Sequence, residues 1–145
     1  KNHHTIGNMI PVPTGFNIDR AWNFAEFDYW DLAMMKIKEW YDSEKKNDAP
    51  LFQLLNNSPE TVEYCKEWLK YFIEWSDFVK DNYLEDFTSI NEQGDYIPIE
   101  FWGNHNYETP NLPNEKNEFI YFLKRLNSCI EKRGTSIINK LFNND

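Results

Sequence analysis

The sequence predicts a mainly α fold: a single-domain helical bundle with three principal helices and irregular segments at residues 1–27 and 91–113. Apolar residues recur at spacings of three and four over long stretches, which is the period of an amphipathic helix. Glycine, proline and asparagine gather at the opening and between these stretches, where they interrupt helices. The 145 residues can bury one core, so we expect residues 1–145 to form one domain.

The first principal helix is expected over residues 28–46. Asp28 and Asp31 fall in its first turn and two lysines in its last, which complements the helix dipole. A break follows at residues 47–50, which end in proline. The apolar residues of this helix share one face: Trp30, Ala33, Met34, Ile37 and Tyr41.

The second helix begins at residues 58–59, where a serine suits the N-cap and a proline the first helical position. We expect it to continue to about Phe87, before the turn sequence of residues 91–95. Its apolar seam alternates spacings of three and four and therefore favours a facing helix. The seam consists of Val62, Cys65, Leu69, Phe72, Ser76, Val79 and Tyr83, flanked by Tyr64, Trp68, Tyr71 and Trp75.

The stretch of residues 96–103 is an edge strand or an extended loop, because Pro98 argues against a central strand. The last helix is expected to begin near Pro113. Gly134 should interrupt it, as a C-cap or a kink before a terminal helical piece. The residues expected to face inward are Phe119, Phe122, Leu123, Leu126 and Ile130.

Charge and composition exclude several classes of function. The net charge of −9 argues against nucleic-acid binding, and no apolar run approaches the ~18 residues of a membrane span. Cys65 and Cys129 lie on apolar faces and are expected to be buried free thiols. No secretion signal is visible, so we expect a cytoplasmic protein. A basic stripe on the last helix is interpreted as a solvated face: Lys124, Arg125, Lys132, Arg133 and Lys140.

The candidate catalytic residues lie in the irregular segments. The histidines are His3, His4 and His105, and a neutral imidazole can bind divalent metals. Their spacing matches no metal motif, so neither a metal site nor a cofactor is predicted. Arg20 precedes Asp28 and Asp31 closely enough to pair with either, which would tie the opening to the first helix.

Aromatic residues make up 17% of the chain, more than the predicted stripes can bury. Exposed rings are good anchors for a protein partner or for self-association. The alternative is that the irregular segments cover these rings. The rings without a place on the stripes are Trp22, Phe24, Phe27, Trp40, Trp75, Phe101 and Trp102.

Gly7, Asn8 and Asn17 resemble the Gly-Asn…Asn stretch of HNH-type nucleases. In that group the first asparagine fixes a loop that presents the catalytic histidine, and the second lies near the metal. The resemblance covers about the first twenty residues. The Asp-His that should precede it has no equivalent here unless it lies upstream of Lys1, and Asp28 and Asp31 stand where histidine or lysine is expected.

The opening is also similar to that of small uncharacterised bacterial proteins, which carry a His-Thr-Ile-Gly-Asn…Pro-Val-Pro opening. The matching positions are residues 4–8, 11–13 and 16–17, Arg20 and residues 28–32. This resemblance implies that the opening and the first helix form one unit, and it implies no activity. The chain begins at Lys1 and not at methionine, which leaves an upstream segment open.

Two hypotheses for function follow. The first is a small acidic helical protein, not an enzyme, that binds a protein partner or a second copy of itself. The rival is a metal-dependent hydrolase or degenerate HNH-like nuclease. The candidate catalytic residues of the rival are His4, Asn8 and His105, and the candidate binding residues are Asn17, Arg20, Trp22, Asp28 and Trp102.

Overall fold

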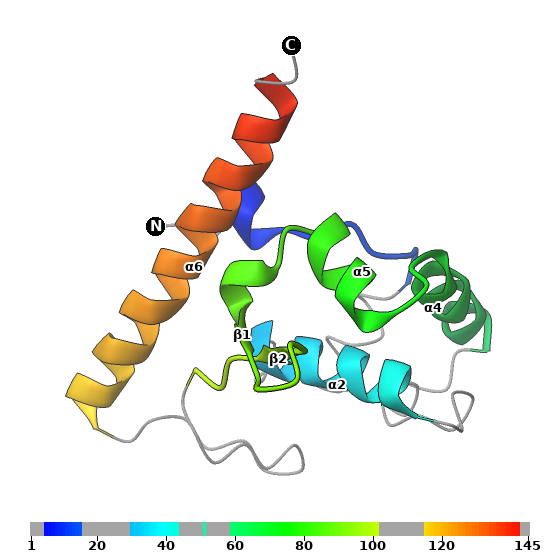
Figure 1. Cartoon of the computed structure of the whole chain (residues 1–145), viewed down its shortest axis with the longest axis horizontal. Coiled ribbons are helices and arrows are strands. Elements are labelled where there is room, and N and C mark those ends of the chain that lie inside the picture. The colour runs from blue at the N-terminus through cyan, green and yellow to red at the C-terminus, as the bar shows by residue number, and fades with distance from the viewer. Residues whose placement is uncertain (1–4, 16–29, 44–50, 52–58, 102–114, 143–145) are drawn as a thin grey trace. The chain divides into compact units, whose positions relative to one another are not determined.

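The computed structural model describes residues 5–15, 30–43, 51, 59–101 and 115–142. Over these ranges it has four α-helices and one two-stranded sheet, so the mainly α prediction is confirmed, while the bundle of three principal helices stays a prediction. The elements, with η for a 3-10 helix, are η1 (Ile6–Asn8), α2 (Trp30–Asp42), α4 (Pro59–Tyr71), α5 (Trp75–Asp81), η3 (Glu85–Phe87), β1 (Thr88–Ile90), β2 (Tyr96–Pro98) and α6 (Lys116–Phe142) (Figure 1).

Contacts divide the chain into two compact units. Unit 1 comprises residues 1–10 and 79–145, and unit 2 comprises residues 11–78. The prediction of one domain stays a prediction. None of the described helices combines the length and the apolar character that a membrane span requires.

The helix expected to run to Phe87 is broken at residues 72–74, so that prediction is wrong. The carbonyl of Glu74 accepts hydrogen bonds from the N–H groups of Asp77 and Phe78, both at 3.1 Å. In return, the Asp77 carboxylate accepts the Glu74 N–H at 3.3 Å. The side-chain bond is one half of a capping box, and together with the backbone bonds it starts α5 as a new helix. The apolar spacing continues across the break and conceals it.

A left-handed residue ends α5. Tyr83 has φ 55°, and its N–H donates to the Lys80 carbonyl at 3.1 Å. The N–H of Leu84 donates to the Val79 carbonyl at 2.8 Å, which completes a Schellman motif. The chain then turns into η3 and the hairpin instead of continuing as a helix.

The hairpin confirms the turn predicted at residues 91–95. Of the two alternatives for the stretch that follows, β2 confirms the edge strand over the extended loop. The Asn91 side chain accepts the N–H groups of Gln93 at 3.0 Å and Asp95 at 2.8 Å. Gly94 supplies the positive φ of 89° that this turn requires. Strands β1 and β2 are antiparallel, with Thr88 opposite Pro98, Ser89 opposite Ile97 and Ile90 opposite Tyr96.

Helix α6 runs through Gly134 without interruption, which corrects the predicted break. The helix passes Gly7 at this point, and a Cβ built on Gly134 would lie 3.5 Å from the backbone nitrogen of Gly7, an ordinary van der Waals contact. Phe122 and Ile130 are buried as predicted. Phe119 and Leu123, also expected inward, are 39% and 38% exposed, because η1 and η3 cover only one side of the helix.

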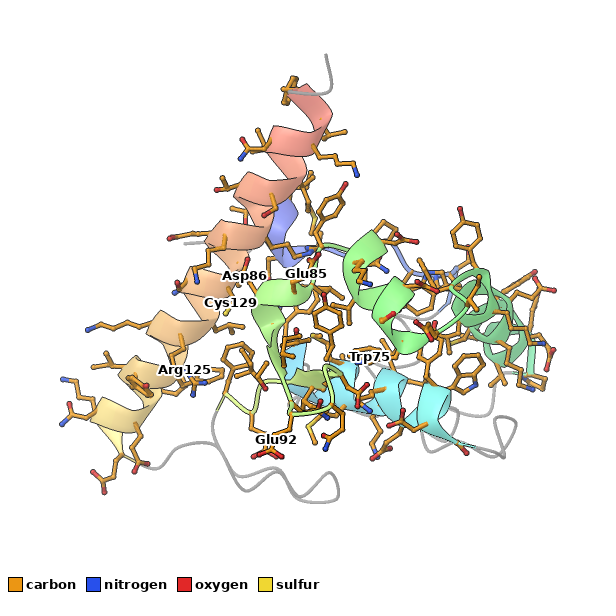
Figure 2. The ribbon with its side chains drawn as sticks, viewed as in Figure 1. Trp75, Glu85, Asp86, Glu92, Arg125 and Cys129 are labelled. Carbon is orange, nitrogen blue, oxygen red and sulfur yellow. The ribbon has the colours of Figure 1, made fainter. Side chains whose placement is uncertain are left out.

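Asp86 of η3 lies beside α6. Figure 2 shows Asp86 beside Cys129, with Arg125 one turn earlier on the helix. Lys132 pairs with Asp86 at 3.5 Å, and Arg125 donates to the Phe101 carbonyl at 3.4 Å. Part of the predicted basic stripe is therefore engaged within unit 1.

The core of unit 2 is aromatic. Phe78 is fully buried and stacks on Trp75, with ring centroids 5.7 Å apart. The Tyr41 hydroxyl donates to the carbonyl of Leu69 at 2.8 Å. Trp40 is 1% exposed. Trp40 and Trp75, together with Phe101 of unit 1, are thus core residues and form no interaction surface.

Both cysteines are buried free thiols, as predicted. Cys65 lies in the core of unit 2, where burial raises its thiol pKa to about 12. Burial also raises the pKa of Cys129. Neither thiol is set up as a nucleophile, because nucleophilic cysteines have a lowered pKa.

Candidate functional site

A buried arginine fixes the N-terminal segment to α6. Arg133 is 2% exposed, and its Nη1 donates to the carbonyl oxygens of Ile6 at 3.2 Å, Gly7 at 2.9 Å and Met9 at 2.7 Å. Its Nε donates to the carbonyl of Asn82 at 2.9 Å. Burial lowers the pKa of the guanidinium to about 10, so it stays charged at neutral pH. The prediction that Arg133 belongs to a solvated stripe is wrong.

The packing of Gly7 explains why this contact needs a glycine. A Cβ built on Gly7 would lie 1.9 Å from the carbonyl oxygen of Ile130 and 2.9 Å from the nitrogen of Gly134. Both obstacles are helix backbone, which cannot move aside without breaking α6. We call η1, Met9 and Arg133 together the anchor.

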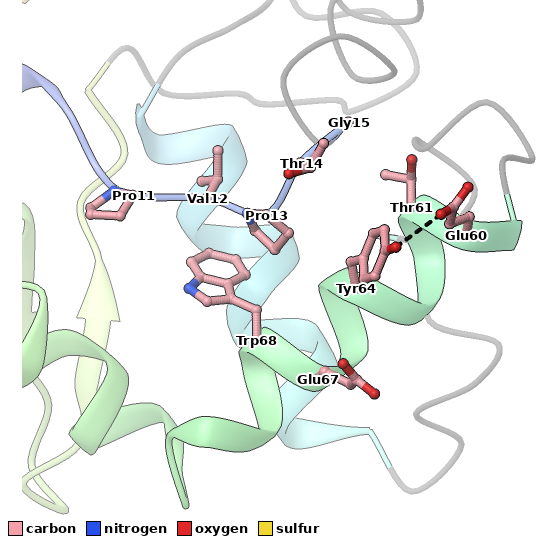
Figure 3. Close-up of a pocket in the computed structure, with 10 residues that line it drawn as sticks. All are labelled: Pro11, Val12, Pro13, Thr14, Gly15, Glu60, Thr61, Tyr64, Glu67 and Trp68. Carbon is pink, nitrogen blue, oxygen red and sulfur yellow. Dashed lines mark hydrogen bonds between the residues drawn. The ribbon is translucent and has the colours of Figure 1, made fainter.

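Beyond the anchor, the chain enters unit 2 and forms one wall of a pocket of about 620 Å³ (Figure 3). The other wall is one face of α4, whose lining residues recur at helical spacings. The pocket is lined by Pro11, Val12, Pro13, Thr14 and Gly15 from the segment and by Glu60, Thr61, Tyr64, Glu67 and Trp68 from α4.

A second glycine brings this segment close to α4. Gly15 has φ 85°, a left-handed conformation that favours glycine. A Cβ built there would lie 2.4 Å from the Oγ1 atom of Thr61, which is itself buried. Gly15 therefore sets both the direction of the turn and the narrow end of the pocket.

The pocket combines carboxylates with aromatic rings. The Tyr64 hydroxyl donates to the Glu60 carboxylate at 2.8 Å, and this bond raises the pKa of the Tyr64 phenol. The Trp68 ring is oriented by edge contacts with Phe72 and Phe78, at centroid distances of 6.3 and 5.4 Å. None of the ten lining residues is basic. Negative charge beside π faces suits a cation.

The corner that follows α4 is exposed and apolar. Tyr71, at the end of the helix, is 79% exposed, and Ile73 in the bend is 89% exposed. Between them, Phe72 is buried and packs on Phe78, with ring centroids 5.1 Å apart. We call residues 71–74 the corner.

Most of the predicted site residues fall outside the part of the chain that the structure describes. Asn8 lies in η1, where its N–H donates to the Thr5 carbonyl at 2.9 Å, and it does not line the pocket. Whether His4 and His105 meet stays a prediction. Within the described ranges, no group of three or more histidine, cysteine or acidic side chains could hold a metal. Outside the described residues lie His4, His105, Asn17, Arg20, Trp22, Asp28 and Trp102.

Sequence reasoning missed the α4 wall of the pocket. Tyr64 and Trp68 were expected only to broaden the apolar seam. The available signal was their spacing with Glu60 and Glu67, which places acids and rings on one helix face. That residues 11–15 lie against this face could not be inferred from spacing.

Fold and pocket define a small, mainly helical protein with an acidic, aromatic pocket. The chain belongs to a family of unknown function (DUF6994), whose family model matches residues 1–137. The match covers the anchor and both walls of the pocket, and it confirms the expected membership of an uncharacterised family. No curated protein and no solved structure matches the chain. Its function is therefore unknown, and the nuclease resemblance and the bacterial origin stay predictions.

Proposed function

We propose that this protein acts by binding another protein, and that the corner forms the contact surface. The observation that carries this proposal is the exposure of Ile73 at 89% beside Tyr71 at 79%. Burying each such side chain against a partner contributes about 1.5–3 kcal/mol to the binding free energy, before the entropy and desolvation costs of association are subtracted. Aromatic and apolar residues that project from a surface are typical anchors of protein interfaces.

The geometry of the corner is well defined, which lowers the entropy lost on binding. The Phe72 N–H donates to the Leu69 carbonyl at 3.3 Å, and the bonds between Glu74 and Asp77 fix the far side. Because the intervening Phe72 is buried in the core, Ile73 is held outward.

The charge of the chain favours a basic partner. A net charge of −9 repels polyanions, so the proposal includes neither nucleic acid nor a membrane surface. A cytoplasmic location belongs to the same proposal. Self-association is the second version of the binding hypothesis. The metal-dependent hydrolase gains no support from the described residues.

Site-specific photo-crosslinking in the native host tests the proposal. A photoreactive phenylalanine analogue at Ile73 should give discrete adducts whose composition is read by mass spectrometry. The same analogue at Lys70, exposed on the neighbouring face of α4, is the control. Adducts from position 73 that are lost in a Tyr71→Ser background support the corner as an interface, and an adduct of doubled mass indicates self-association. The same adducts from both positions, or none from position 73, would contradict it.

A further inference from the structure

We propose that the pocket between residues 11–15 and α4 binds positively charged side chains from an extended basic segment of the partner protein. The inference rests on the proposed function, because it assigns the cation to a protein partner. It concerns a different set of residues from the corner, so the two can fail separately.

Charge is the first argument. Glu60 and Glu67 both line the pocket, and no lining residue carries a positive charge. On α4 the lysines lie elsewhere: Lys66, for example, pairs with Glu63 at 2.7 Å on a face outside the pocket. A guanidinium or ammonium group entering the pocket thus meets carboxylates without a competing lysine among the lining residues.

The aromatic rings are the second argument. Trp68 and Tyr64 line the same cavity, and the face of an aromatic ring attracts a cation within about 6 Å. Their orientation is set before any ligand arrives, since Trp68 packs on Phe78 and Tyr64 is hydrogen-bonded to Glu60 (Figure 3). Such preorganisation reduces the entropy lost on binding.

Spacing selects the form of the occupant. Glu60 and Glu67 are seven residues apart on a helix, or about 10 Å along its axis. Carboxylates at that separation do not converge on one metal ion such as Ca²⁺, because each oxygen ligand must lie within about 2.6 Å of the ion. In a polyproline II segment, side chains three residues apart point the same way and lie about 9 Å apart. Two basic residues at that interval would reach both carboxylates.

An NMR titration of the 145-residue chain tests this inference. The probe is the capped peptide Arg-Pro-Pro-Arg, and the signal is the indole N–H of Trp68, assigned from its loss in Trp68→Phe. We expect a saturable shift that weakens at least tenfold when citrulline, the neutral analogue, replaces both arginines. Arg-Arg-Pro-Pro, with the same composition, should bind more weakly.

Charge-neutral variants locate the site. Glu60→Gln and Glu67→Gln should each raise the Kd of Arg-Pro-Pro-Arg about tenfold. Glu63→Gln changes the net charge equally but lies outside the pocket, so it should leave the Kd within about twofold. An equal loss in all three variants would mean general charge attraction and would overturn the inference.

The remaining outcomes separate the two proposals. Equal binding of the citrulline peptide, or of free arginine, would overturn a site for a basic protein segment. No peptide binding together with position-specific crosslinks at the corner would overturn the inference and leave the proposed function standing. Specific peptide binding without such crosslinks would support the pocket and contradict the corner.

Discussion

The N-terminal segment contacts one helix in each unit, and the two contacts are built differently. In unit 1, η1 lies so close to α6 that a Cβ on Gly7 would meet helix backbone. The guanidinium of Arg133 donates a hydrogen bond to the Gly7 carbonyl across this contact. In unit 2, residues 11–15 come close to α4 at Gly15, and the segment and the helix together line a pocket of about 620 Å³. The first contact is filled and the second is open.

This difference separates a structural role from a binding role. A contact filled by backbone and a buried charge has no room for a ligand, so changes that crowd it or remove the charge should reduce stability. At a contact that leaves a cavity, a substitution can change the affinity for a ligand while the fold persists. The predictions below test that distinction, beginning with the largest expected effect.

Replacing Gly7 by alanine should destabilise unit 1 by about 3 kcal/mol or more, because the new Cβ meets immovable helix backbone. Gly134→Ala is the matched control on the other side of the same contact. Its Cβ would be in ordinary van der Waals contact, and alanine favours the helix by about 1 kcal/mol over glycine. Urea unfolding followed by circular dichroism measures both. Similar effects of the two variants would mean that the contact is not tight.

Arg133→Met should lower the free energy of unfolding by about 3 kcal/mol, because it removes a donor on which one buried and three part-buried carbonyls depend. Arg133→Lys keeps the charge, but its single ammonium cannot reach all of these oxygens, so we expect an intermediate loss. Thermal unfolding of the three proteins gives the order. A methionine variant as stable as the parent would show that the anchor does not depend on the guanidinium.

Gly15→Ala should be milder, at about 2 kcal/mol. Its positive φ disfavours alanine by about 1–2 kcal/mol, and the obstacle is a side-chain oxygen of Thr61 that can shift slightly. The same variant should weaken binding of the arginine peptide, because the narrow end of the pocket moves. Gly7→Ala at permissive temperature should leave peptide binding unchanged. Loss of binding in both variants would erase the distinction between the two contacts.

The smallest effect concerns the core of unit 2 at high pH. Burial holds the Cys65 thiol neutral in the folded protein up to a pKa of about 12, whereas an unfolded thiol ionises near pH 8.5. The contribution of the buried Cys65 thiol to the free energy of unfolding is therefore complete below about pH 8.5 and falls as the pH rises towards 12. The loss should reach about 1 kcal/mol by pH 9.5. Cys65→Ala should lack it, and identical pH profiles of the two proteins would indicate that the core admits the thiolate.

Local features could be predicted from the sequence. Helix α2, the start of α4 at Pro59 and the turn at residues 91–95 depend on residues within a few positions of each other. The break at residues 72–74 escaped prediction because a weak capping signal competes with an apolar period that continues across it. Gly134 was interpreted as a C-cap or a kink because these are the usual local roles of a glycine in a helix, whereas α6 continues through it beside Gly7.

By itself the sequence determined the helical character, the net charge of −9 and the burial of two thiols, since periodicity and composition are local or additive properties. The tertiary structure alone decided which side of α6 is covered, that the charge of Arg133 is buried, and that residues 11–15 complete a pocket on α4. Arg133 and Gly7 are 126 positions apart. Partners at that separation are chosen by the packing of the whole chain, and no spacing rule within a helix or strand encodes them.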